Sequence, residues 1–165
     1  MLKDRGLEVA SNRPLRDGGT TTYEGGVRVP CIVRWPGRLK AGTVCREPLS
    51  SMDLLPLALA AAGIPVPADR VLDGRDPAAV LAGEVPSPHD VLVFEFGRFS
   101  GIRMGRHKLV RPRPDAAYEL YDLETDVGET VNLTARHPEI HARLVHAREQ
   151  WLAGVVSVRS GQPGR

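Results

Sequence analysis

The chain has 165 residues, of which 42% are hydrophobic and 25% charged, a composition typical of a folded globular protein and unlike that of a disordered or fibrous one. Its 22 Lys and Arg residues are interleaved with 20 Asp and Glu residues, so the net charge is only +2 and the basic stripe of a nucleic-acid binder is missing. No apolar run reaches the roughly 20 residues that span a bilayer, and residues 1–6 lack the apolar core of a signal peptide. We therefore expect a soluble chain with no nucleic-acid or membrane partner, whose compartment stays unknown.

The first half predicts a long loop followed by extended and helical segments. Residues 11–26 are dense in Gly, Thr, Asp and Pro without any period, which is typical of a loop. Residues 27–35 are rich in β-branched and apolar side chains and end at Pro36-Gly37, which predicts a buried strand, and residues 43–48 predict a second short extended piece.

A helix is expected over residues 51–62, between capping serines and Gly63. Asp53 suits its positive N-terminal end, and Pro56 falls close enough to the first turn to be tolerated. Its expected apolar face consists of Leu54, Leu55, Ala58, Leu59 and Ala62. Residues 64–88, rich in Pro, Gly and Asp around a short helix at 77–81, form the expected internal boundary.

The second half predicts a small antiparallel sheet and a helix. Strands are expected over residues 91–96, 101–110 and 118–123, because short apolar alternations there are separated by turn residues. A helix should begin at His137-Pro138-Glu139, and its apolar stripe should cover the sheet. The members of that stripe are Ile140, Leu144, Ala147 and Trp151.

Cysteine and histidine spacing indicates no metal motif. Cys31 and Cys45 lack the C-x-x-C spacing and are interpreted as two ordinary thiols, although a single disulfide stays open. His107 is interpreted as a strand residue. The other histidines are interpreted as loop and helix-surface residues: His89, His137, His141 and His146.

Three stretches together resemble the C-terminal third of the sulfatase family, within the alkaline-phosphatase-like superfamily. They are SNRPLRDGGTTTYEGGVRVPCIVRWPG (residues 11–37), SSMDLLPLALAAAGI (residues 50–64), and residues 101–140 with their closing phrase ELYDL, Glu129 and Asn132-Leu133. The resemblance implies a sulfuric ester hydrolase whose formylglycine attacks a sulfate ester beside a divalent cation, usually calcium, while Lys and His residues contact the sulfate. The Cys- or Ser-x-Pro-x-Arg segment that yields formylglycine does not occur, because neither Cys31 nor Cys45 is followed by it.

The resemblance also implies roles for individual residues. Asp4, in Asp4-Arg5-Gly6, stands near the family's late metal motif, but Arg5 takes the place of a ligand and cannot coordinate a cation. Gly19 stands where the family loop has the Lys that reaches the sulfate. The candidate substrate-loop residues are Arg16, Thr21, Tyr23 and Glu24. Tyr23, Glu24 and the glycines after them could instead shape the backbone, with glycines allowing unusual dihedrals, and Arg16 could hold the loop.

We therefore expect an α/β fold: the edge of a large mixed sheet with a packed helix, then a small antiparallel sheet covered by a C-terminal helix. The expected divisions are residues 1–88, a remnant of the catalytic domain; residues 89–156, a C-terminal α+β subdomain; and residues 157–165, a tail. The chain is expected to be an inactive fragment with no catalytic residue and no bound calcium of its own. The missing N-terminal portion could be its partner. A non-catalytic binding or interaction module, and a related phosphoester hydrolase, remain as alternatives.

Overall fold

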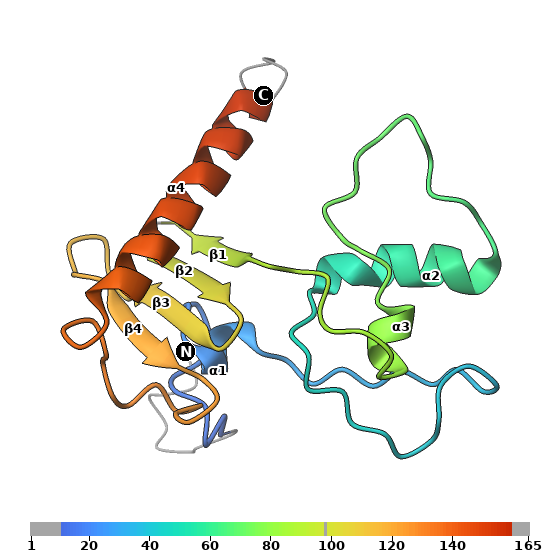
Figure 1. The fold of residues 1–165 in the computed structure, drawn as a ribbon, viewed down its shortest axis with the longest axis horizontal. Coiled ribbons are helices and arrows are strands. Elements are labelled where there is room, and N and C mark those ends of the chain that lie inside the picture. Colours follow the sequence, from blue (N-terminus) through green and yellow to red (C-terminus); the bar gives the residue numbers. More distant parts are fainter. Residues whose placement is uncertain (1–10, 98, 160–165) are drawn as a thin grey trace, which may run out of the picture. The chain divides into compact units, whose positions relative to one another are not determined.

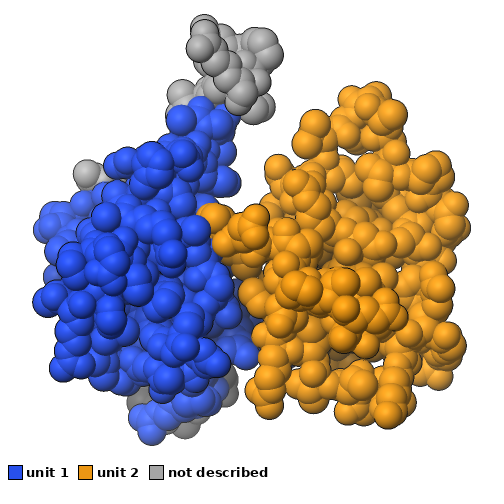
Figure 2. Space-filling view, in the orientation of Figure 1, with its two compact units in different colours: residues 1–30, 93–165 blue, residues 31–92 orange. Residues whose placement is uncertain are grey.

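The computed structural model describes residues 11–97 and 99–159, with side chains described up to residue 155. The elements in chain order are α1 (Glu24–Val27), the 3-10 helix η2 (Ser51–Asp53), α2 (Leu54–Ala62), α3 (Ala78–Leu81), β1 (Leu92–Phe96), β2 (Phe99–Met104), β3 (His107–Arg111), β4 (Glu119–Asp122) and α4 (Pro138–Arg159) (Figure 1). The chain forms two compact units, residues 1–30 with 93–165, and residues 31–92 (Figure 2).

The first unit is built on a four-stranded sheet in the order β1-β2-β3-β4. The pairs β2–β3 and β3–β4 are antiparallel, with Ile102 opposite Leu109 and Leu109 opposite Leu120. These three side chains have no exposed surface, and neither has Leu144 of α4. Because α4 packs on β2 and β3, the prediction of a small antiparallel sheet covered by the C-terminal helix is confirmed (Figure 1).

The predicted strand over residues 101–110 is instead a hairpin. Met104 pairs with His107, so Gly105 and Arg106 form a two-residue turn between β2 and β3. Gly105 has a φ of +56°, which glycine adopts without steric cost. The prediction assigned one strand to the whole segment and missed this two-residue turn.

The helix of the second unit begins as predicted but buries another face. Ser50 and Asp53 form a capping box, and the helix ends at Gly63 with a φ of +67°. Its sequence, LLPLALAAA, is apolar on all sides, so periodicity cannot select the buried face. The buried residues are Pro56 and Leu57, whereas Leu54 and Leu55 are about half exposed, so the expected apolar face was wrong.

The strand expected over residues 27–35 is not formed. Val27 ends α1, and residues 28–35 have no regular structure, with Ile32 95% exposed. Residues 43–48 also form no strand. A strand needs a neighbour that pairs with its backbone N–H and C=O groups, and no strand of the described ranges pairs with either segment. The large mixed sheet is thus not seen in residues 11–97 and 99–159.

Helix α4 extends further than predicted. It continues to Arg159, so residues 157–159 of the expected tail are helical, and residues 160–165 lie outside the described residues. Within the part of the chain that the structure describes, no helix combines the length and the apolar character needed to cross a membrane.

Candidate functional site

The first unit holds a glycine-rich loop, defined here as residues 16–26, against its sheet. Gly25 N–H donates to the carbonyl oxygen of Arg16 at 2.9 Å, which closes the base of the loop. The Asn12 side-chain amide supports this closure by donating to the carbonyl oxygens of Asp17 (3.1 Å) and Gly25 (3.2 Å). The tip, residues 17–20, is largely exposed. The loop therefore has a fixed base and an open tip.

The glycines at the end of this loop are needed for close approach. A Cβ on Gly25 would lie 2.4 Å from the Arg16 carbonyl oxygen, and a Cβ on Gly26 would lie 2.2 Å from the Thr21 carbonyl oxygen. Neither residue is among those with a positive φ. We expected these glycines to be needed for unusual dihedral angles, and this reason is wrong. They are needed because other backbone atoms of the loop lie too close to leave room for a side chain.

Arg16 lies in a cluster of aromatic and acidic side chains. Its Nη1 donates to Tyr121 Oη at 2.8 Å, and its guanidinium carbon lies 4.0 Å from the centroid of the Tyr23 ring. Both tyrosine hydroxyls donate to one oxygen, Glu119 Oε2, at 2.5 Å from Tyr23 and 2.6 Å from Tyr121. Burial, followed by the bond to Glu119, raises the pKa of both tyrosines, so both stay protonated donors. We call these four residues the Arg16 cluster.

A second group, the buried triad, consists of Glu24, Lys108 and Glu129. Lys108 Nζ lies 2.7 Å from Glu24 Oε1 and 3.1 Å from Glu129 Oε1. Lys108 and Glu129 have no exposed surface, and Glu24 is 2% exposed. Glu24 N–H also donates to Glu129 Oε2 at 2.7 Å. One ammonium group thus serves two buried carboxylates, and it links the loop to β3.

The structure brings three of the four predicted loop residues together on the sheet. Arg16 and Tyr23 lie in the Arg16 cluster, and Glu24 lies in the triad. Thr21 is different, since its buried hydroxyl has no hydrogen-bond partner among the described residues. Its neighbour Thr22 reaches the sheet instead, donating to the Ser100 carbonyl oxygen at 3.0 Å.

The remaining sequence candidates lie apart. Asp4, the predicted metal ligand, lies outside the described residues. Gly19 is exposed at the loop tip with a φ of +64°. Sequence reasoning assigned no role to the partners on the sheet side. Two signals were present in the sequence. Glu119, Tyr121 and Glu129 belong to the closing phrase that carries the family resemblance, and the i, i+2 spacing of Glu119 and Tyr121 places both on one face of a strand. These partners are Lys108, Glu119, Tyr121 and Glu129.

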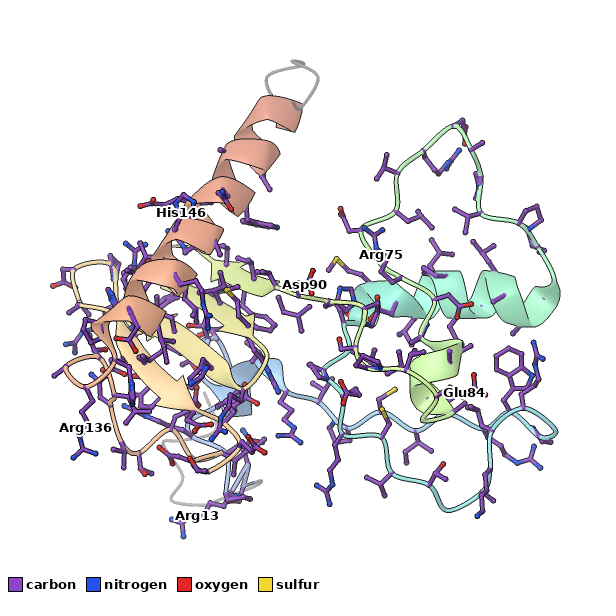
Figure 3. The ribbon with its side chains drawn as sticks, viewed as in Figure 1. Arg13, Arg75, Glu84, Asp90, Arg136 and His146 are labelled. Atoms are coloured by element: carbon purple, nitrogen blue, oxygen red, sulfur yellow. The ribbon has the colours of Figure 1, made fainter. Side chains whose placement is uncertain are left out.

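The second unit has its own buried contact between a histidine and a carboxylate. His89 Nε2 lies 2.9 Å from both carboxylate oxygens of Asp53, which is 2% exposed. The same carboxylate accepts from the N–H groups of Ser50 and Arg75, each at 2.8 Å. Figure 3 labels Arg75 in the segment between α2 and α3. The interpretation of His89 as a loop residue was therefore incomplete, because its side chain connects this loop to Asp53 at the start of α2.

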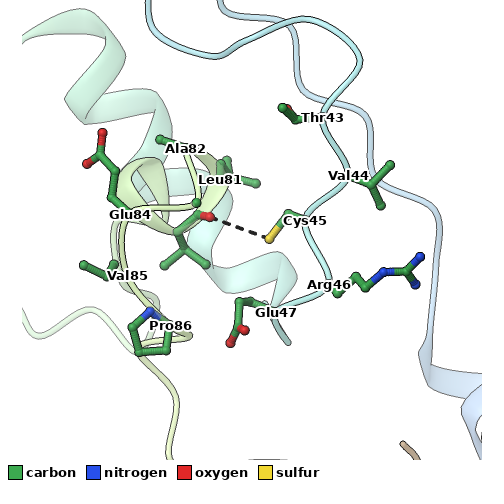
Figure 4. Close-up of a pocket in the computed structure, with 12 residues that line it drawn as sticks. Thr43, Val44, Cys45, Arg46, Glu47, Leu81, Ala82, Glu84, Val85 and Pro86 are labelled. Carbon is green, nitrogen blue, oxygen red and sulfur yellow. Dashed lines mark hydrogen bonds between the residues drawn. The ribbon is translucent and has the colours of Figure 1, made fainter.

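An open pocket in this second unit is lined by residues 43–47 and 80–86 (Figure 4). Cys45 Sγ lies 3.7 Å from the Val80 carbonyl oxygen at its edge. Cys31 and Cys45 are both free thiols, so the disulfide that we left open is not formed.

The comparisons with known proteins point to one family. The model described as N-sulphoglucosamine sulphohydrolase, C-terminal, matches residues 20–152. The chain is 44% identical over 86 residues to steryl-sulfatase of Mus musculus, covering 52% of this chain and 14% of that protein. It is 36% identical over 146 residues to arylsulfatase A of Homo sapiens, covering 72% of this chain and 28% of that protein.

A solved structure shows the same fold. It is described as the crystal structure of Ps i-CgsB in complex with k-i-k-neocarrahexaose, and it matches with a TM-score of 0.77 and 27% identity, over 86% of this chain and 32% of that chain. The chain belongs to the sulfatase family, in the part that the C-terminal family model describes. It spans less than a third of the length of these relatives.

Proposed function

We propose that this chain serves as the C-terminal part of a sulfuric ester hydrolase, where it carries and orients the glycine-rich loop, and that it hydrolyses no ester by itself. The observation that carries the proposal is the attachment of the loop. Its base is closed by the Gly25–Arg16 bond and its end is tied to Lys108 of β3, whereas residues 17–20 remain exposed. A rigid scaffold with an open loop tip is the usual arrangement of a functional loop.

The predicted loop residues fit this role in different ways. We propose that Tyr23 and Glu24 hold the loop through the Arg16 cluster and the triad. We also propose that Arg16 ties the beginning of the loop to Tyr121 of β4 and, through its carbonyl oxygen, to Gly25 at the end of the loop. Thr21 remains a candidate substrate-loop residue near the tip. Gly19 occupies the position where, by resemblance, the family has the sulfate-contacting Lys. Removing such a charged donor typically costs about 3 kcal/mol of transition-state stabilisation, so we expect weak activity even in a longer protein.

By the same resemblance, the complete enzyme would hold calcium. Among the described residues, no three His, Cys, Asp or Glu side chains form a group that could hold a metal ion. The described part of the chain therefore does not fit a calcium site, and we assign no step of the reaction to a metal here. We propose that the ligands lie elsewhere in the complete enzyme, with Asp4 as the one candidate in this sequence.

The proposal is tested by assaying the purified chain with 4-nitrophenyl sulfate and 4-nitrophenyl phosphate, with and without calcium. We expect no turnover by the chain alone, and turnover of the sulfate ester once a sulfatase N-terminal portion encoded upstream is joined to it. Turnover of the phosphate ester alone by the joined protein would support a phosphoester hydrolase instead. Hydrolysis by the chain on its own would overturn the proposal.

A second candidate, a non-catalytic binding or interaction module, is favoured by the closed core of the first unit. Ile102, Leu109 and Leu144 are fully buried within that unit, which is what independent folding requires. This candidate predicts a monodisperse chain with one cooperative unfolding transition, whereas a dependent fragment should aggregate. The division into residues 1–88, 89–156 and 157–165 is likewise a proposal, which limited proteolysis would test.

A further inference from the structure

Glu129 contacts both ends of the glycine-rich loop. Its carbonyl oxygen accepts a hydrogen bond from Arg16 Nη1 at 2.7 Å, at the beginning of the loop. Its carboxylate Oε2 accepts one from Glu24 N–H at 2.7 Å, near the end of the loop. A single residue, 105 positions away from Glu24 in the sequence, thus holds both sides of the segment whose tip is open.

Glu129 itself is held firmly in place. It has no exposed surface, and its φ of +52° lies in the left-handed region that non-glycine residues rarely adopt. Its N–H donates to the Asp126 carbonyl oxygen at 3.1 Å, while the Asp126 carboxylate accepts from the N–H groups of Thr130 and Val131. Such a conformation persists only where the surroundings over-determine it, so Glu129 is a rigid anchor.

We propose that Glu129 is the positioning residue of the glycine-rich loop, that it orients the tip through Arg16 and Glu24, and that it holds the loop more tightly when its carboxyl group is protonated. The inference deepens the proposed function and rests on it, because that function gives the loop tip its purpose.

The charges around Glu129 explain why protonation tightens the loop. The nearby cations compensate the Glu129 carboxylate less well than that of Glu24. Lys108 lies closer to Glu24 than to Glu129, and, among the described residues, Arg28 pairs with Glu24 alone, at 3.8 Å. The Arg16 guanidinium donates to the backbone carbonyl oxygen of Glu129 and not to its carboxylate. The triad therefore carries two negative charges and one positive charge without contact to water. Burial raises the pKa of Glu129 above its ordinary value, and the negative charge of Glu24 adds to this effect. The attraction to Lys108 and the hydrogen bond from Glu24 N–H act in the opposite direction without cancelling it.

The direction of the pH dependence follows from this raised pKa. When the loop detaches, Glu129 meets water and its pKa returns towards the ordinary value of 4.5. The closed loop therefore binds the proton more tightly than the open loop does. Closure is most favourable below about pH 4.5, and it weakens as the pH rises from there through the raised pKa.

The test uses amide hydrogen exchange of the full 165-residue chain, expressed as protection factors over a range of pH. In the wild-type chain, the protection of the Glu24 and Gly25 amides, relative to those of β2 and β3, should fall as the pH rises through this window. Glu129→Gln keeps an acceptor for Glu24 N–H without a titrating group, so the relative protection should become independent of pH there. Glu129→Ala removes the acceptor, and we expect about tenfold or more loss of relative protection at every pH.

Glu124→Gln is the matched control, since this exposed carboxylate lies on the same β4–α4 connection and should behave as wild type. An equal loss of protection in loop and strands on Glu129→Ala would show a merely structural role and overturn the proposal. The proposal would also be overturned if the relative protection of the Glu24 and Gly25 amides in the wild-type chain did not change with pH. None of these readouts depends on ester hydrolysis. A pH-responsive loop in this chain, together with a joined protein that does not hydrolyse the sulfate ester, would therefore refute the proposed function and leave the role of Glu129 standing.

Discussion

Lys108 shows at the scale of a residue why a buried charge must keep its partners. It is fully buried between Glu24 and Glu129. Lys108→Met removes the only positive charge of the triad. Among the described residues, Glu129 then keeps no cationic partner for its carboxylate and Glu24 keeps only the exposed Arg28, which we expect to cost about 3–5 kcal/mol of unfolding free energy at pH 7. Urea unfolding measures this loss. The same substitution at exposed Lys40 should cost less than about 0.5 kcal/mol, and comparable losses at both sites would contradict the assignment.

The two tyrosines of the Arg16 cluster should differ in their contribution to stability. Tyr121 Oη accepts from Arg16 and donates to Glu119, whereas Tyr23 Oη only donates to Glu119. Tyr121→Phe should therefore cost about 2–3 kcal/mol and Tyr23→Phe about 1–2 kcal/mol in chemical denaturation. Since Glu119 keeps one tyrosine partner in each single variant, the double variant should lose more unfolding free energy than the two single variants do in sum. A reversed order of the two single variants would show that the bond to Arg16 contributes little.

At the scale of an element, the glycine-rich loop closes only where side chains are absent. Gly26→Ala would place a Cβ 2.2 Å from the Thr21 carbonyl oxygen, so the backbone must shift. We expect a loss of about 1–3 kcal/mol. Gly154→Ala in α4 meets nothing within 4 Å and should stabilise the helix by about 0.5–1 kcal/mol. Thermal unfolding of the two variants side by side tests whether position, rather than glycine itself, decides the effect.

The start of α2 should show acid sensitivity of the opposite sign to that of Glu129. Burial by itself would raise the pKa of Asp53. The hydrogen bonds from Arg75 and Ser50, followed by the contact with His89, outweigh burial and lower this pKa below its ordinary value of 3.8. This stability is present above about pH 3.8 and is lost as the pH falls through the lowered pKa. Asp53→Asn should remove that acid-dependent part in unfolding curves between pH 2 and 7. Exposed Asp90 provides the control, and an Asp90→Asn variant should keep the wild-type profile.

At the scale of the whole molecule, order should be unequal along the chain. The strands β2 and β3 carry a fully buried core, whereas residues 28–49 lack helices and strands and expose Ile32 and Val44. We expect hydrogen-exchange protection to be strongest in β2 and β3 and weakest in residues 28–49. Mass-spectrometric exchange on the intact chain measures both. Protection of residues 28–49 comparable to that of β3 would show that this segment has a pairing partner.

The strengths and failures of the sequence predictions have particular causes. The starts of α2 and α4 were predicted because capping residues and an early proline act locally. The hairpin at Gly105 and Arg106 was missed because its turn is only two residues long, so the two strands follow each other almost directly in the sequence. The strand at residues 27–35 was wrong because β-branched composition makes a strand only where a neighbour pairs with it.

By itself, the sequence determined the family, the position of the loop and the C-terminal sheet with its helix, since these depend on local motifs and on the periodicity of apolar residues. Only the tertiary structure decided what Arg16, Tyr23 and Glu24 do. Their partners on β3, on β4 and at Glu129 lie about 100 positions away in the sequence. Tyr23 and Glu119, for example, are separated by 96 positions. Hydrogen bonds and ion pairs over such separations depend on how strands are brought together, and no local pattern encodes them. The candidate site of this sulfatase-family chain is therefore a property of its folded sheet.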